Sequence, residues 1–132
     1  MTDSSDYVGW RKLREFAAVD LTKSFVLSWH IDAGALLIDV DLLLEQGHPF
    51  YEGPRPSEKV CIRPAIIEFP YCQAILPEGV EAEGSMADVV ATLSLGAIEG
   101  LRRFSDGPFE IRGDFGMVRI DAERPILRLR NA

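Results

Sequence analysis

The chain has 132 residues, of which 47% are hydrophobic, and its formal net charge is −7. This length suits one domain, residues 1–132, that buries its own core without a disulfide framework or a structural metal. No stretch is apolar for long enough to span a membrane, the N-terminus lacks the layout of a secretion signal, and the acidic balance argues against nucleic-acid binding. We therefore expect a cytoplasmic protein.

The first segment, residues 7–18, allows two interpretations. Val8, Leu13 and Phe16 share an approximate helical face, with Asp6 as an N-cap, which indicates a short helix. Gly9 weakens that helix. The alternative is an edge strand over residues 16–21 that leads into the next element.

The pattern is strongest over residues 24–44, where apolar residues alternate with polar ones on both sides of a turn at Asp32–Ala35. A period of two predicts two strands and a hairpin. Pairing through this turn sets Trp29 opposite Ile38 and places eight apolar residues on one face: Phe25, Leu27, Trp29, Ile31, Leu36, Ile38, Val40 and Leu42.

The next stretch, residues 45–56, holds three prolines and two glycines and cannot be a central strand. It is also rich in side chains suited to binding, namely His48, Phe50, Tyr51 and Glu52. One interpretation is a functional loop. The other is that Phe50 and Tyr51 close one end of the sheet core.

Residues 60–69 predict another strand, with a bulge or bend at Pro64 because the apolar residues before and after it are out of phase. Arg63 lies among apolar neighbours, so we expect it either to pair with Glu68 or Asp39 or to face a ligand. Cys61 and Cys72 lie at different distances from the turn at Pro70, which predicts two free thiols.

The remaining chain begins with an acidic loop over residues 77–88. Residues 89–95 favour a strand because they are β-branched, although a helix over 86–95 is the alternative. Asp106-Gly107 and the Gly113–Gly116 turn predict two hairpins, the second pairing Phe109 with Ile120. A third turn at 122–125 leads to a strand over 126–130, so we expect an antiparallel meander.

Charge is unevenly distributed along the chain. Residues 31–99 carry twelve acids and three bases, whereas residues 100–132 carry seven arginines and five acids. The acidic middle would attract a basic protein through two loops, provided that they lie on the same side of the sheet. Their acids are Glu45, Glu52, Glu78, Glu81 and Glu83. The alternative is that these charges serve solubility alone.

No constellation predicts catalysis, a metal site or a cofactor. His30, Asp39 and Asp41 share a strand face that could ligate a divalent cation, but a solvated face has the same composition. Neither cysteine has a basic neighbour that would activate it. The sequence has no phosphate-binding glycine loop and no nucleophile elbow.

Three segments carry a family resemblance: residues 24–29, residues 48–51 together with 61–64, and residues 113–120. Together they resemble small uncharacterised bacterial β-rich domains, and the last also resembles immunity proteins of bacterial toxin systems. The resemblance implies a β fold and a protein-binding role, and it supplies no catalytic residues.

We therefore expect an all-β fold of about eight strands, mainly antiparallel, arranged as a sandwich or open barrel with at most a short N-terminal helix. The leading functional hypothesis is a non-enzymatic interaction module, immunity-like, that binds a basic partner. The alternative is a small-molecule binding protein or hydrolase with a pocket near His48, Tyr51 and Arg63. A third hypothesis is a purely structural subunit of a homodimer formed through an exposed strand edge. We expect the chain to be a monomer or a homodimer.

Overall fold

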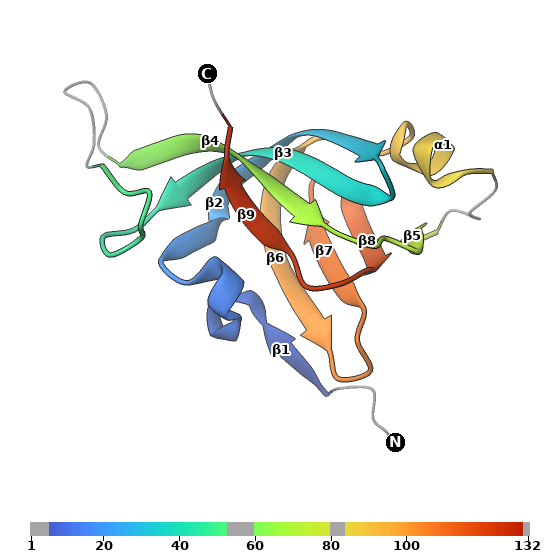
Figure 1. Ribbon diagram of the computed structural model, residues 1–132, viewed down its shortest axis with the longest axis horizontal. Coiled ribbons are helices and arrows are strands. Elements are labelled where there is room, and N and C mark those ends of the chain that lie inside the picture. The colour runs from blue at the N-terminus through green and yellow to red at the C-terminus, as the bar shows by residue number, and fades with distance from the viewer. Residues whose placement is uncertain (1–5, 53–59, 80–83, 131–132) are drawn as a thin grey trace.

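The computed structural model describes residues 6–52, 60–79 and 84–130 (Figure 1). They form one antiparallel sheet of nine strands with very little helix, which confirms the all-β prediction. In chain order the elements are β1 (Tyr7–Gly9), the 3-10 turns η1 (Trp10–Lys12) and η2 (Arg14–Phe16), β2 (Val19–Asp32), β3 (Ala35–Leu44), β4 (Cys61–Phe69), β5 (Ala74–Pro77), α1 (Met86–Val90), β6 (Gly96–Phe104), β7 (Phe109–Gly113), β8 (Gly116–Asp121) and β9 (Ile126–Leu129). Within the described residues no helix is long and apolar enough to cross a membrane.

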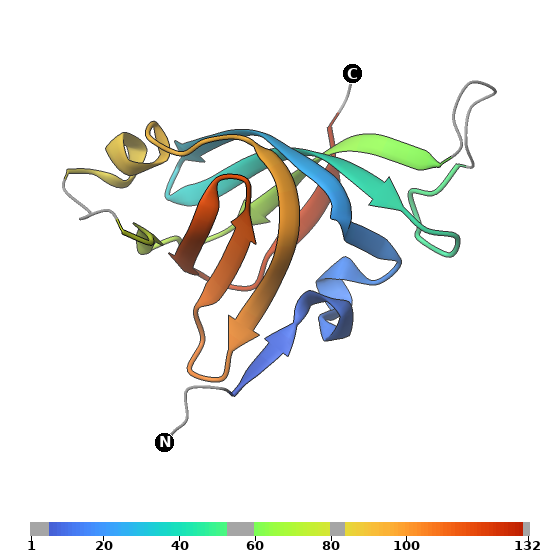
Figure 2. The same cartoon turned by 180° about the vertical axis from the view of Figure 1, so that it is seen from behind.

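The sheet closes into a barrel because β4 and β5 together pair with β8 and β9. Its order is β5-β8-β7-β6-β2-β3-β4-β9, with β1 added beside β6. The chain runs from β4 into β5 and from β8 into β9. The β5–β8 pair at one end of the order and the β4–β9 pair at the other end are therefore two parts of one continuous pairing. The meanders β2–β3–β4 and β6–β7–β8 thus form a barrel, visible from both sides in Figures 1 and 2. Closure removes most of the free edges that could pair with a second chain.

The N-terminal segment fills the place where β2 and β6 separate. β2 pairs with β6 only at Phe25 and Val26, and β1 takes over beside the far end of β6. Residues 7–18 are not an α-helix, because their buried residues recur every three positions and so suit 3-10 turns. The three buried side chains are Trp10, Leu13 and Phe16.

The β2–β3 hairpin keeps the predicted register near its turn and loses it farther away. Trp29 pairs with Ile38 and is buried, as predicted. The turn itself is tighter, because Asp32 pairs with Ala35 and only Ala33 and Gly34 form the loop.

A one-residue bulge at Leu27 then shifts the pairing, so that Val26 lies opposite Val40. Val26 is 1% exposed, whereas Phe25 is 48% exposed and Leu27 is also exposed. The prediction that Phe25 and Leu27 face the core is therefore wrong. Each bulge reverses the face of every residue beyond it.

β4 is regular where a bulge was expected. Its nine residues pair with β3 without a register shift, and Pro64 lies opposite Asp41. The carbonyl of Pro64 accepts a hydrogen bond from the Arg130 amide at 3.0 Å. The side chains on the core side of the strand are Cys61, Arg63, Ala65, Ile67 and Phe69. The apolar residues before and after Pro64 looked out of phase in the sequence because an arginine occupies one of these core-side positions.

The C-terminal half combines confirmed and wrong predictions. The predicted hairpin at Asp106-Gly107 is present, and the one at Gly113–Gly116 has the predicted pairs, including Phe109 with Ile120. The strand predicted over residues 89–95 is wrong, and the alternative helix is right only over Met86–Val90, which forms α1, because Ser85 and Asp88 form a capping box. The meander ends at β8, since β9 pairs with β4 and not with β8. Cys61 and Cys72 are buried free thiols, as predicted.

Candidate functional site

The loop after β3 packs against one end of the core. Phe50 and Tyr51 are partly buried against it. The amide of Phe50 donates to His48 Nδ1 at 3.0 Å, and the Tyr51 amide donates to the His48 carbonyl at 3.0 Å. His48 therefore shapes its own turn, and partial burial lowers the pKa of its imidazole. These contacts favour the core-closing interpretation of this loop over a functional one.

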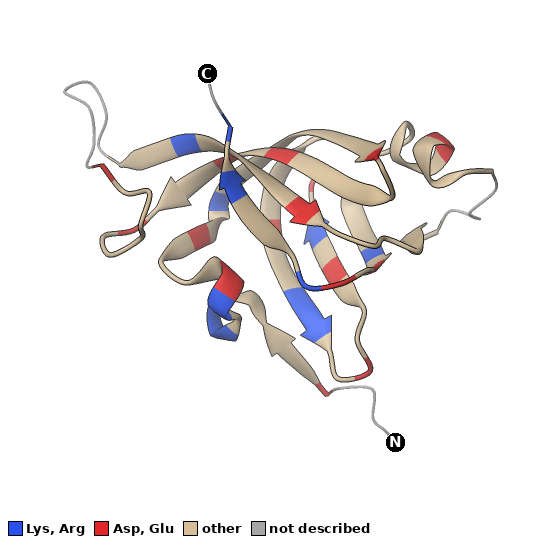
Figure 3. Cartoon of the chain, in the orientation of Figure 1, with Lys and Arg blue, Asp and Glu red and all other residues tan. Residues whose placement is uncertain are grey.

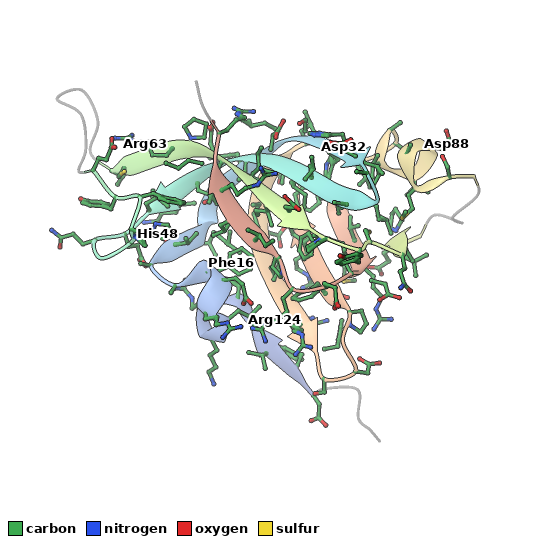
Figure 4. The ribbon with its side chains drawn as sticks, in the orientation of Figure 1. Phe16, Asp32, His48, Arg63, Asp88 and Arg124 are labelled. Carbon is green, nitrogen blue, oxygen red and sulfur yellow. The ribbon has the colours of Figure 1, made fainter. Side chains whose placement is uncertain are left out.

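Arg63 lies at the same end of the molecule as His48 (Figure 4). It is 8% exposed, and its Nη1 donates to the Ile62 carbonyl at 2.8 Å. The two carboxylates predicted as its partners form ion pairs with other arginines. Glu68 pairs with Arg128 at 2.7 Å, and Asp39 pairs with Arg130 at 3.5 Å.

The described acids of the two acidic loops lie at opposite ends of the long axis (Figures 1 and 4). Glu45 and Glu52 are exposed at the end where His48 lies, whereas Glu78 is exposed beyond β5 at the other end, near Asp88. Glu81 and Glu83 lie outside the described residues. Since fields of exposed charges are screened within about 10 Å, the described acids of the two loops do not form one acidic surface, contrary to the prediction.

A different surface is built around Tyr71, in the bend between β4 and β5. Its side chain is 78% exposed, and its backbone is left-handed with φ of +52°. Neighbouring backbone groups hold the bend on two sides. The Cys72 amide donates to the Gly34 carbonyl at 2.9 Å, and the Gln73 amide donates to the Asp121 carbonyl at 2.7 Å. Tyr71 therefore projects from a backbone that is fixed in place.

Hollows flank Tyr71 on both sides. One has a volume of about 350 Å³ and is lined by Asp32, Glu68 and Arg128, among others. The second, of about 380 Å³, is lined by Asp121 and Glu123. We call these residues together the Tyr71 surface. It carries four carboxylates and one arginine, so its net charge is negative.

Three of the four carboxylates are available for a partner. Glu68 is paired with Arg128, and Figure 3 shows the basic segment of β9 beside the acidic end of β4. Asp32, Asp121 and Glu123 are exposed and form no ion pair within the described residues. Carboxylates beside an exposed aromatic ring suit a cation, which can pair with the acids and lie over the ring.

The Tyr71 surface offers carboxylates and an aromatic ring. The nearest sulfur, Cys72, is buried, and burial raises the pKa of its thiol, which keeps it protonated and unreactive. Among the described residues no three His, Cys, Asp or Glu side chains gather as a metal site. Asp39, one of the residues considered for such a site, accepts a hydrogen bond from Ser28 and pairs with Arg130.

Sequence reasoning missed Tyr71 for a physical reason. The signal available was a tyrosine after Pro70 in a turn, and tyrosines in turns are usually packed. Its exposure depends on the bend that β8 and β9 impose on β4 and β5, which is a long-range effect. No family model, curated protein or solved structure matches the chain, so the function of this surface has to be argued from its own chemistry.

Proposed function

We propose that the protein is a non-enzymatic interaction module that binds a basic segment of a partner protein at the Tyr71 surface. An immunity-type role, in which the module covers a basic functional site of another protein, would use such a surface. The proposal keeps the basic partner expected from the sequence and moves its contact away from the Glu45 and Glu78 loops.

The observation that supports it most is the exposure of Tyr71 on a strained, rigid bend. Left-handed backbone costs an ordinary residue about 1–2 kcal/mol, and nothing in the core requires a tyrosine there because its ring lies in solvent. Strained non-glycine residues gather at functional sites. Tyrosine is also enriched among residues that dominate binding energy, since its large ring loses little conformational entropy.

The surrounding charges support a basic partner. The acids without ion pairs lie on both flanks of the ring, so a lysine or arginine that approaches from either side meets a carboxylate. Such complementarity mainly raises the association rate, and salt weakens it.

The test is a peptide-display selection on the wild-type protein, followed by binding kinetics. We expect the selected peptides to contain clustered lysine or arginine. The variant Tyr71→Asn should weaken their affinity by about 30-fold or more, the loss typical of a central aromatic contact. Glu123→Lys should slow association, and the wild-type association rate should fall as salt rises.

The matched control is Glu45→Lys, which reverses an exposed acid that lines neither hollow beside Tyr71. Its kinetics should equal those of the wild type. The proposal is wrong if the selected peptides lack basic residues, or if folded Tyr71→Asn binds them with wild-type affinity.

A further inference from the structure

A separate hollow of about 170 Å³ lies on the outer face of the β6–β7 pair, beside β1. Four residues of β6 and β7 form the floor of the hollow. They lie side by side because Gly100 pairs with Arg112 and Arg102 pairs with Glu110. Tyr7 and Trp10 form its aromatic wall. None of these residues belongs to the Tyr71 surface, so a ligand in this hollow would bind independently of a basic partner at Tyr71.

The wall carries a hydrogen-bond donor without an acceptor. Trp10 as a whole is 7% exposed, and its indole Nε1 has no hydrogen-bond partner within the described residues but is itself open to solvent. Trp29, the other tryptophan, donates its Nε1 to the Ser94 carbonyl at 2.9 Å. An indole N–H that reaches solvent can donate only to water or to an acceptor on a ligand. The Trp10 donor borders the hollow, where a ligand could supply that acceptor.

Gly100 leaves space in the floor of the hollow, although its backbone conformation does not require a glycine. Gly100 is not left-handed, and a Cβ built on it would meet only Trp10 Nε1, at 4.0 Å. Glycine inside a strand lowers stability relative to alanine and often marks a place where a ligand approaches the backbone. The absent side chain therefore keeps the space beside the indole N–H open.

The charged groups of the hollow leave one cation available. Arg102 is neutralised by Glu110, whose Oε1 accepts from Nε and lies 2.8 Å from Nη2. The same guanidinium is 4.5 Å from the centre of the Tyr7 ring, so it is held in place. Arg112 donates Nη2 to the Met117 sulfur at 3.5 Å, a weak bond, and pairs with no carboxylate within the described residues.

We propose that this hollow binds a small ligand that has a flat ring and a carboxylate. The ring packs against the aromatic wall over Gly100. The carboxylate accepts hydrogen bonds from Trp10 Nε1 and from the guanidinium of Arg112, which is suited to planar anions.

The test uses benzoate as the probe and the two indole N–H signals as reporters in a proton–nitrogen NMR spectrum. Benzoate, added up to about 20 mM, should shift the Trp10 signal saturably and leave that of Trp29 unchanged, because Trp29 is already bonded. Benzyl alcohol, which has the ring without the charge, should produce a much smaller shift. Trp10→Phe assigns the signals by removing one of them.

Two variants and one control complete the test. Arg112→Met should weaken benzoate affinity about tenfold through loss of a charged hydrogen bond, and Gly100→Ala should weaken it while the protein stays folded. Arg119→Met, a neighbouring arginine that does not line the hollow, should bind as the wild type does. The proposal is overturned if benzoate gives no saturable Trp10 shift, if both indoles shift alike, if benzyl alcohol binds equally, or if neither variant changes the affinity.

Discussion

At the scale of single residues, the left-handed backbone of Tyr71 should reduce the stability of the fold. Asparagine tolerates left-handed backbone better than other residues that bear a Cβ. We therefore expect Tyr71→Asn to leave the free energy of unfolding unchanged or to raise it by up to about 1 kcal/mol. Urea denaturation measures this directly. A loss of more than about 1 kcal/mol would show that the ring stabilises the fold and would remove the main support for the proposed function.

His48 predicts a dependence of stability on pH. Its pKa is lower in the folded protein than the ordinary value of 6.5, and its Nδ1 can accept the Phe50 amide only when it is unprotonated. The unfolded chain therefore binds the proton more readily. This contribution is fully present above pH 6.5 and is lost as pH falls through the lowered pKa.

The variant His48→Asn keeps an acceptor for the Phe50 amide in an Asx turn and cannot titrate. Its urea midpoint should change less between pH 7.5 and pH 5.5 than that of the wild type. Equal changes in the two proteins would show that other groups account for the pH dependence.

At the scale of elements, the bulge at Leu27 decides which residues of β2 support the core. Val26→Ala should lower the free energy of unfolding by about 1.5–3 kcal/mol because it removes buried methyl groups. Phe25→Ala should cost less than about 1 kcal/mol, although it deletes more atoms, because Phe25 is on the outer face. Urea denaturation of both variants measures which loss of stability is larger. A larger loss for Phe25→Ala than for Val26→Ala would support a register without the bulge.

The hairpins show which strand pairs can be predicted from local sequence. The turn at Ala33-Gly34 and the Gly113–Gly116 turn set the pairing of the residues beside them, and alternation predicted it correctly. Alternation failed where a residue breaks the pattern for a nonlocal reason. Arg63 made a regular strand look irregular, and Leu27 made a bulged strand look regular.

The position of the Tyr71 surface also depends on long-range contacts that local sequence does not predict. Composition predicted a protein with acidic binding surfaces, but the place where acids gather depends on which strands meet. Asp32 and Glu123 flank the same tyrosine because β4 and β5 bend around the end of β8, and no local pattern encodes that bend. The loop at His48 had the more conspicuous composition and packs against the core instead.

At the scale of the whole molecule, one ion pair holds the N-terminal segment against the barrel. Arg124, in the turn between β8 and β9, donates Nη2 to Glu15 Oε1 at 2.9 Å and Nε to Oε2. Glu15 belongs to η2, which carries the buried Phe16. The bonds from Arg124 lower the pKa of the Glu15 carboxyl, so this contribution is present above pH 4.5 and is lost as pH falls below it.

Arg124→Gln should therefore speed hydrogen exchange of the Leu13, Phe16 and Ala17 amides at neutral pH, because these amides close the two 3-10 turns. Exchange in β7 should be unaffected. The difference between variant and wild type, measured by mass spectrometry, should shrink as pH falls below 4.5. Equal exchange at neutral pH would mean that the turns are held by burial alone.

The closure of the barrel also dictates an order of folding. Each meander joins neighbours in sequence, whereas the β2–β6, β4–β9 and β5–β8 seams join residues far apart in the chain. Loop-closure entropy opposes distant contacts until local ones have formed. Conservative truncations inside the β7–β8 hairpin should therefore slow refolding, whereas truncations of Leu127 at the seam should mainly speed unfolding. The bend that presents Tyr71 lies at this seam, so it should take shape only in the last step.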